Sequence, residues 1–290
     1  MQKERTGIPI PEGPELRPSR DQLRQLLVGK SIVRLLPTSV GRYRKQSPIG
    51  LIEINRDLPL VVESIDVKGK FMWWTLRGNR SVWYLWSTYG MSGQWSTNPS
   101  NHSSFIVEYN DADQFVTKDQ QKLFFNDQRR FGTIKFVSEI ELHKKKLASL
   151  GPDVLEDPPL SPEIYAERIL LKPNRTISEA LMDQSCLSGV GNYLKAEILY
   201  RSGVSPHRGV VDLSAEEIIE LWAETISASR ESYLDRGASI RTYKTVDDQK
   251  GKAQFFFRIY GLKECPLGHA VIREETKDGR TSWWCDHCQK

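Results

Sequence analysis

Residues 181–206 read LMDQSCLSGVGNYLKAEILYRSGVSP, and this stretch decides the organisation of the C-terminal half. Apolar side chains recur at helical spacing on both sides of the glycine-containing turn 188–192, which predicts two helices joined by a tight connection. The second helix begins near Asn192, and Gly203 suits its end. Its first N–H groups and the Asn192 amide form a predicted site for a DNA phosphate. A glycine-rich turn between helices is, by itself, more often just a tight connection.

Further helices surround this element. Thr176 with Glu179, and Ser214 with Glu217, fit the capping box, in which a hydroxyl and a carboxylate each accept a backbone N–H. We therefore predict a helical domain over residues 161–250. The preceding HKKKLASLGPDVLEDPPLSPE is rich in lysine, proline and acidic residues, and it predicts a linker over 141–160.

The N-terminal half has the pattern of a β-domain. Short β-branched and aromatic runs follow one another from residue 31 to residue 137: SIVRLL, GLIEI, LVVESIDV, FMWWTL, SVWYLW, SFIVEY and KLFFN. So many short strands predict a β-sandwich or barrel, which we assign to residues 11–140. One helix is predicted before them, with Ser19 as its N-cap and Gly29 just beyond its end.

The last forty residues, 251–290, carry a predicted metal site. Three strands are expected, at AQFFFRIYG, AVIREET and RTSWWC, and the dipeptide 278–279 (Asp-Gly) predicts a tight hairpin turn. Two ligand pairs bracket this hairpin: Cys265 with His269, and Cys285 with Cys288. Folding the hairpin brings four N and S donors together, as structural zinc requires. His287 is a rival ligand, and chance placement of thiols is the alternative interpretation.

Composition sets wider limits. The chain has 290 residues, of which 39% are hydrophobic and 27% charged, with a net charge of +4. These values predict an ordinary globular protein and suit a polyanionic partner without requiring one. There is no apolar run long enough for a membrane span, and residues 1–10 lack the apolar core of a signal peptide. We expect a monomer inside the cell.

Several motifs together resemble one family over nearly the whole chain. They are PEGPEL at 11–16, KGKF at 68–71, YGMSG at 89–93, NDQRRFG at 126–132, SGVGNYLKAEIL at 188–199, RIYG at 258–261 and GRTSWWCDHCQ at 279–289. This set resembles the formamidopyrimidine-DNA glycosylase and endonuclease VIII family. The resemblance implies an α+β multidomain fold: a β-sandwich with one leading helix, a helix-two-turn-helix domain and a β-hairpin zinc finger. The Cys-His-Cys-Cys ligand set looks more like the eukaryotic endonuclease VIII-like 2 and 3 group than the four-cysteine bacterial pattern.

The resemblance also implies an activity, the excision of oxidised bases from DNA followed by cleavage of the abasic strand. Pro11 matches the family's nucleophile, an N-terminal proline whose free secondary amine attacks the sugar C1′. Glu12 matches the carboxylate that moves protons, and Glu15 matches a second acidic position of the motif. Lys70 matches a basic residue that holds the phosphate beside the lesion.

Further residues match the family's DNA contacts. A base that undergoes chemistry leaves the stack, and the enzyme fills the space left behind. By resemblance, Met91, Arg129 and Phe131 fill that space. Asn192 and Arg280 match phosphate contacts of the helical element and the finger.

Two positions depart from the family pattern. Thr88 stands where many members have a histidine three residues before the methionine. Pro11 follows Ile10, and the nitrogen of an internal proline is a tertiary amide without a nucleophilic lone pair. We therefore expect residues 1–10 to be an extension absent from the active form. The alternatives are an inactive binder of damaged or branched DNA, a lysine nucleophile such as Lys70, and a zinc-finger module that binds protein.

Overall fold

The structure is a computed structural model that describes residues 10–111, 120–238, 246, 252 and 257–290. The chain divides into two compact units. The helical unit comprises residues 1–14, 149–241 and 251–290, and the sandwich unit comprises residues 15–148 and 242–250. Most of the predicted extension 1–10, residues 239–245 and 247–251, and residues 253–256 of a predicted strand lie outside the described residues.

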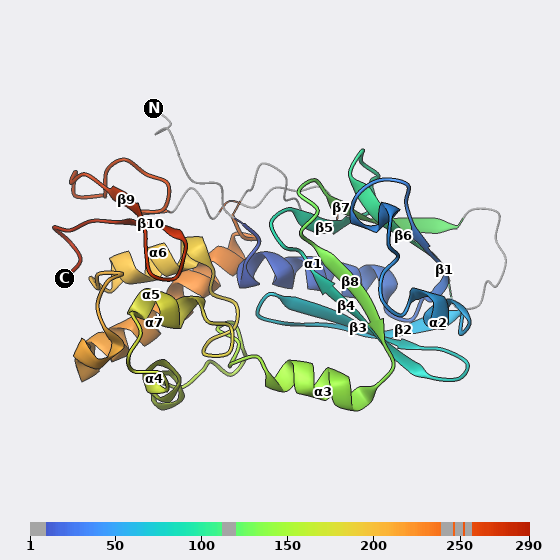
Figure 1. Cartoon of the computed structure of the whole chain (residues 1–290), viewed down its shortest axis with the longest axis horizontal. Coiled ribbons are helices and arrows are strands. Elements are labelled where there is room, and N and C mark those ends of the chain that lie inside the picture. The colour runs from blue at the N-terminus through green and yellow to red at the C-terminus, as the bar shows by residue number, and fades with distance from the viewer. Residues whose placement is uncertain (1–9, 112–119, 239–245, 247–251, 253–256) are drawn as a thin grey trace. The chain divides into compact units, whose positions relative to one another are not determined.

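The strands of the sandwich unit form one antiparallel ladder in the order β5-β7-β6-β1-β2-β3-β4-β8 (Figure 1). They are β1 (Ser31–Pro37), β2 (Leu60–Lys68), β3 (Phe71–Arg77), β4 (Val82–Thr88), β5 (Gly93–Ser96), β6 (Ser103–Asn110), β7 (Gln121–Asp127) and β8 (Thr133–Val137). Neither β5 nor β8 is among the predicted runs; both are short, and β5 contains no β-branched residue.

The ladder folds over on itself, which confirms the predicted β-sandwich. Trp74 of β3 lies 4.8 Å from Trp95 of β5 between ring centroids, although these strands are far apart in the ladder. Phe105 of β6 and Phe136 of β8 are 5.9 Å apart in the same way. These four rings are 2% exposed or less, so the core lies between the two layers.

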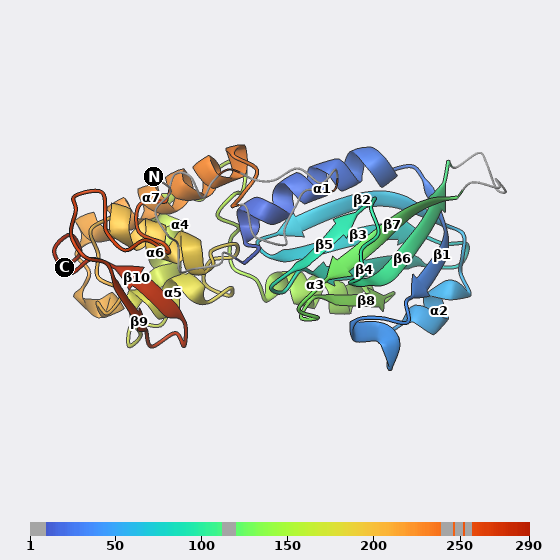
Figure 2. The same cartoon turned by 90° about the horizontal axis from the view of Figure 1, so that it is seen from above.

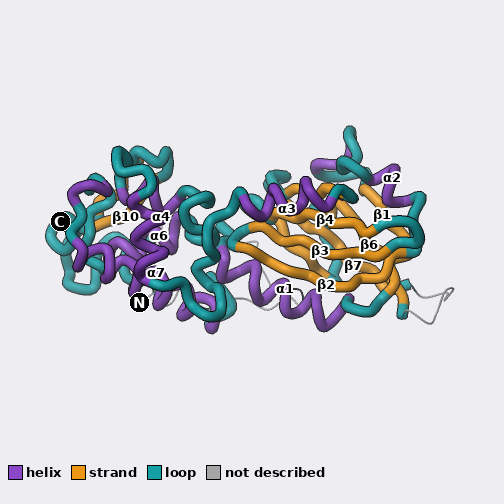
Figure 3. Tube along the Cα trace, turned by 90° about the horizontal axis from the view of Figure 1, so that it is seen from below, coloured by secondary structure: helices purple, strands orange, loops and turns teal. Residues whose placement is uncertain are grey.

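Helices cover this unit: α1 (Gly13–Leu27), η1 (Arg42–Arg44), α2 (Leu51–Asn55) and α3 (Ile140–Ala148). α1 and α3 lie on opposite sides of the strands (Figures 2 and 3). The run GLIEI is α2 and not a strand; Gly50 is left-handed (φ 78°), and Leu51 and Ile54 are buried at helical spacing. Ser19 is also not an N-cap, because α1 begins six residues earlier and Ser19 bonds the Tyr89 hydroxyl. Gly29, with φ 83°, follows the helix end as predicted.

The helical unit contains α4 (Pro162–Leu170), α5 (Ile177–Met182), α6 (Asn192–Arg201), η2 (Val210–Asp212), α7 (Ala215–Leu234) and the hairpin β9 (Ile272–Glu275) with β10 (Thr281–Trp284). Both predicted capping boxes are present, at the starts of α5 and α7. Gly203, with φ 68°, lies just beyond α6 as predicted. The first half of the predicted linker is helix α3, which belongs to the sandwich unit.

The predicted strand AQFFFRIYG is wrong for its described residues, 257–261, which form turns. Their N–H groups have another partner: the carboxylate of Glu197 on α6 accepts from Arg258, Ile259 and Tyr260 at 2.8–3.1 Å. Within the described part of the chain, none of the helices combines the length and the apolar character that crossing a membrane would require.

Candidate catalytic and DNA-binding site

The N-terminal motif of the helical unit is anchored on helix α6. Pro11 is buried, and Glu12 is 2% exposed. The Glu12 carboxylate accepts three backbone N–H groups at the start of α6, from Gly191 at 2.7 Å, Tyr193 at 2.9 Å and Leu194 at 3.3 Å. A helix N-terminus is a favourable place for a negative charge, so α6 fixes the residue next to Pro11.

Glycine is required where this carboxylate lies. A Cβ on Gly191 would lie 2.6 Å from Cγ of Glu12 and closer still to its carboxylate carbon. The anion site predicted at the start of α6 therefore exists, but its backbone N–H groups already bind the chain's own carboxylate. A DNA phosphate would have to use side chains, and its binding to these N–H groups is ruled out while Glu12 occupies them.

Two such side chains, Asn192 and Arg280, lie near the N-terminal end of α6. The Asn192 amide nitrogen donates to the carbonyl oxygen of Thr281 at 2.8 Å, so the first residue of α6 is joined to the first residue of β10. Arg280 directly precedes that residue and is exposed. The structure therefore brings together Asn192 and the finger residue Arg280, the two predicted phosphate contacts of this unit.

The four predicted metal ligands converge. Ligand atoms of Cys265, His269, Cys285 and Cys288 all lie within 4.8 Å of one another. Cys265 Sγ is 3.9 Å from Cys288 Sγ, and His269 Nδ1 is 3.4 Å from that sulfur. Tetrahedral zinc with its usual bond lengths separates such donors by roughly 3.5–3.8 Å, so the residues fit the ion. His287 stacks on His269 with 4.6 Å between ring centroids and is not a member of the cluster.

In the sandwich unit, two turns bring the predicted space-filling residues together. Met91 lies between β4 and β5, and Arg129 and Phe131 lie between β7 and β8. Arg129 Nη1 is 3.5 Å from Met91 Sδ, and Phe131 is 58% exposed. The backbone of Phe131 packs against Gly90, where a Cβ would be 2.7 Å from the Phe131 carbonyl carbon. An exposed phenylalanine on a turn is not core packing, so this geometry suits insertion into a base stack.

Asp127 holds both turns and was not found from the sequence. Its carboxylate is 2% exposed; it accepts from Ser92 Oγ at 2.6 Å and from the Gly132 N–H at 2.7 Å. Ser92 Oγ in turn accepts from the Arg129 N–H at 2.8 Å. The sequence feature that could have indicated this role is an acidic residue inside an otherwise basic turn motif.

Other predicted residues of this unit have separate positions. Lys70 lies in the turn between β2 and β3 and is half-buried. Glu15 is fully buried in the first turn of α1. Thr88, which replaces the family's histidine, bonds Thr133 Oγ1 at 2.7 Å.

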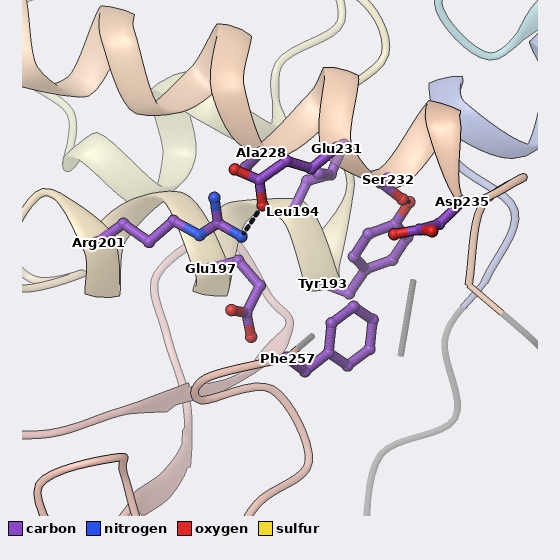
Figure 4. Close-up of a pocket in the computed structure, with 9 residues that line it drawn as sticks. All are labelled: Tyr193, Leu194, Glu197, Arg201, Ala228, Glu231, Ser232, Asp235 and Phe257. Atoms are coloured by element: carbon purple, nitrogen blue, oxygen red, sulfur yellow. Dashed lines mark hydrogen bonds and ion pairs between the residues drawn. The ribbon is translucent and has the colours of Figure 1, made fainter. Parts of the chain in front are cut away.

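Helix α6 also carries two buried charges that sequence reasoning missed, Lys195 and Glu197. Glu197 lines a cavity of about 20 Å³ between α6 and α7, large enough for one water molecule, beside the Arg201–Glu231 ion pair (Figure 4). Burial raises the pKa of the Glu197 carboxyl. The sequence signal was a lysine and a glutamate within an apolar helical stretch, where a solvent-facing position is the usual interpretation.

Comparison with known proteins places this arrangement in a class. The model of the formamidopyrimidine-DNA glycosylase N-terminal domain matches residues 10–134, and that of the formamidopyrimidine-DNA glycosylase H2TH domain matches residues 150–244. The two matches thus place the chain in the class of helix-two-turn-helix DNA glycosylases, and its C-terminal Cys/His cluster is compatible with a zinc finger.

Relatives match this chain over nearly its full length. A formamidopyrimidine-DNA glycosylase of Geobacillus kaustophilus is 29% identical, covering 97% of this chain and all of the relative. One from Bacillus cereus is 30% identical, covering 97% of this chain and 99% of the relative. The chain belongs to the formamidopyrimidine-DNA glycosylase family.

Solved structures have the same fold. The MutM (Fpg) protein of Thermus thermophilus matches with a TM-score of 0.80 at 25% identity, covering 96% of this chain and 98% of that one. Lactococcus lactis Fpg in complex with DNA containing an abasic site matches with a TM-score of 0.80 at 22% identity, covering 97% and 100%.

Proposed function

We propose that this protein is a bifunctional DNA glycosylase and abasic-site lyase that removes oxidised bases, and that Pro11 is its nucleophile. The observation that carries the proposal is the placement of Glu12. Three N–H groups of α6 hold this carboxylate beside Pro11, so a group able to move protons lies next to the proposed nucleophile.

The chemistry follows from these two residues. The secondary amine of Pro11 attacks C1′ of the damaged nucleotide, the bond from C1′ to the base breaks, and the base leaves with a proton. The C1′–O4′ bond of the sugar then breaks, the proton released by the Pro11 nitrogen goes to O4′, and the resulting ring-opened iminium acidifies the C2′ hydrogen. Removal of that proton expels the 3′ phosphate, and a second elimination expels the 5′ phosphate. Glu12 donates and accepts the protons of these steps.

The other predicted residues bind the DNA around this centre. Lys70 holds the phosphate that flanks the lesion, and Met91, Arg129 and Phe131 fill the space of the extruded nucleotide. Asn192 and Arg280 bind phosphate. Structural zinc at Cys265, His269, Cys285 and Cys288 would hold the finger over residues 251–290, a ligand set that looks like that of the eukaryotic endonuclease VIII-like proteins. The protein would act as a monomer on intracellular DNA.

This mechanism requires a free amine on Pro11. In the sequence Ile10 acylates that nitrogen, so the active species would begin at Pro11 after removal of residues 1–10. Intact-mass analysis of the protein from its natural source tests this point. A single uncleaved species that still cleaves abasic DNA would contradict it.

Borohydride trapping on abasic DNA tests the function itself. The 290-residue chain, a chain beginning at Pro11, and the same short chain with Glu12→Gln would be compared on single-stranded and duplex DNA. We expect a reduced covalent adduct only with the form that begins at Pro11, and little product from its Glu12→Gln variant. An adduct of equal yield from the 290-residue chain would transfer the role of nucleophile to a lysine such as Lys70.

The acylated Pro11 nitrogen also favours a second candidate, a binder of damaged or branched DNA that performs no chemistry. It predicts salt-dependent DNA affinity in both forms and an adduct in neither. Binding without any adduct would therefore replace the first proposal by the second. The absence of salt-dependent DNA affinity would instead favour a finger that binds protein.

A further inference from the structure

A buried ion pair joins the tip of the finger hairpin to helix α6. Lys195 Nζ lies 2.6 Å from Asp278 Oδ2, and the two side chains are 0% and 2% exposed. Asp278 lies in the turn between β9 and β10, where an Asp-Gly turn normally has its carboxylate in water. Here the carboxylate points inward, so turn chemistry alone does not account for it.

The same turn is braced from within. Thr276 Oγ1 donates to the second oxygen of Asp278, and Thr276 Oγ1 also lies 2.8 Å from Ser282 Oγ. The Thr276 N–H donates to the carbonyl oxygen of Arg280 at 3.0 Å. The backbone of Arg280 is therefore part of a small hydrogen-bonded unit whose charged centre is Asp278.

Lys195 also interacts with charges outside the ion pair. Burial lowers the pKa of the Lys195 ammonium, while Asp278 and then Glu12 oppose that effect; Arg280 acts in the same direction as burial. The Lys195 charge thus interacts both with the carboxylate beside Pro11 and with charged groups of the finger tip. All four residues belong to the helical unit.

Stability does not explain such a pair. Desolvating two charges costs several kcal/mol, and well-packed apolar residues of similar size are often as stabilising or more so. The ion pair instead fixes the position of the hairpin tip, because only one placement of the tip satisfies both charges and the hydrogen bonds around them. The Asn192 bond to Thr281 is a second fixed point only one residue from Arg280.

We propose that Lys195 and Asp278 are positioning residues that place the Arg280 guanidinium for a DNA phosphate, making the finger tip and the start of α6 one phosphate-binding surface. This proposal rests on the DNA-binding function proposed above. Neither Lys195 nor Asp278 touches the DNA; both act through Arg280.

The test is equilibrium binding of the chain beginning at Pro11 to duplex DNA that contains a stable abasic-site analogue, measured over a range of salt concentrations. The variants are Lys195→Met, Lys195→Arg, Asp278→Asn, Arg280→Ala and the double variant Lys195→Met/Arg280→Ala. Asp278→Asn keeps a good turn residue and a Thr276 partner while removing the charge. Glu274→Gln is the matched control, because it removes the charge of a partly exposed carboxylate of the same hairpin and keeps an oxygen that can accept from Trp284.

We expect Lys195→Met, Asp278→Asn and Arg280→Ala each to weaken binding roughly tenfold, the effect of about one charge-assisted hydrogen bond. Each should lower the slope of log affinity against log salt by about 1, the contribution of one phosphate contact. The double variant should bind no more weakly than Arg280→Ala alone. Lys195→Arg should recover most of the loss, and Glu274→Gln should bind like the parent.

Several results would overturn the proposal. One is a double variant whose loss equals the product of the two single losses, because Lys195 would then act independently of Arg280. Another is parent-like binding by both Lys195→Met and Asp278→Asn. Zinc content and melting temperature identify a variant whose finger is unfolded. If Lys195→Met is such a variant, the proposal is judged on DNA binding by Asp278→Asn and on the recovery of binding by Lys195→Arg. If the parent protein itself does not bind, the proposed function fails and not this inference.

Discussion

Substitution of Gly191 by alanine should remove the support of Glu12 without touching either residue's backbone conformation. Gly191 has φ −129°, which alanine adopts freely, so any effect is steric. The new Cβ would lie 2.6 Å from Glu12 Cγ, whereas carbon atoms in contact are about 3.5–4.0 Å apart. The side chain must therefore move by about 1 Å. Its hydrogen bonds, now 2.7, 2.9 and 3.3 Å long, would then largely break.

The cost follows from those bonds. A hydrogen bond to a charged group contributes about 1.5–3 kcal/mol, and a displaced carboxylate regains part of this from water, so we expect a net loss of about 2–4 kcal/mol in the free energy of unfolding. The lower entropy of an unfolded alanine chain and the poorer N-cap roughly cancel, at about 0.5–1 kcal/mol each. The yield of borohydride-trapped adduct from the form that begins at Pro11 should also fall, because Glu12 would no longer be held in place.

Urea unfolding of the helical unit and hydrogen exchange of the peptide spanning 188–199 would measure this. Gly209→Ala is the matched control: its φ is −65°, and its Cβ would meet mainly the flexible end of Asp212. The control should stay within about 0.5 kcal/mol of the parent protein. Parent-like stability and trapping in Gly191→Ala would refute the reasoning, since Glu12 would then not depend on the start of α6.

Three further predictions concern the rest of the molecule. Arg129→Ala should lower cleavage of lesions in duplex DNA more than cleavage in single strands, because only a duplex leaves an unpaired partner base; an equal loss on both substrates would contradict this. Removing zinc with a chelator should lower the melting temperature of the helical unit and abolish DNA binding, because the finger's C-terminal residues bond residues 203–205; an unchanged melting temperature measured alongside complete zinc loss would exclude a structural ion. The sandwich unit should lose stability as the pH falls below about 6.5, because burial lowers the pKa of His143 and the unfolded chain then binds a proton that the folded one excludes. Urea midpoints at pH 7.5 and 5.5 test this, and His143→Phe should remove most of the difference.

Patterns with a local physical cause could be predicted from the sequence. The two capping boxes, Gly29 and Gly203 lie where predicted, because a cap depends on a few neighbouring residues. The metal ligands also converge as their spacing indicates. The strand prediction for GLIEI was wrong because five residues fit the periods of a helix and of a strand equally well. The left-handed conformation of Gly50, the first residue of this run, cannot be seen in the sequence, and it makes Gly50 the N-cap of a helix.

Long-range partners could not be predicted in this way. Residues 257–261 have the composition of a strand, yet their N–H groups bond a carboxylate some 60 positions earlier in the chain. Met91 and Arg129 are similarly brought together by turns nearly forty residues apart. For these two residues the family resemblance supplied what periodicity could not.

The missed charges share one helix, and that has a functional consequence. On α6, the N-terminal N–H groups hold Glu12, and Lys195 holds the finger tip through Asp278. Glu197 holds residues 258–260, near the start of the finger segment 251–290. Each anchor is buried, so each fixes its partner more tightly than an exposed contact would. Helix α6 is therefore the common support of the proposed proton-transferring group and of the proposed phosphate contacts. A substitution that shifts this helix should impair catalysis and DNA binding together, whereas substitutions at the turn of Met91 should separate them.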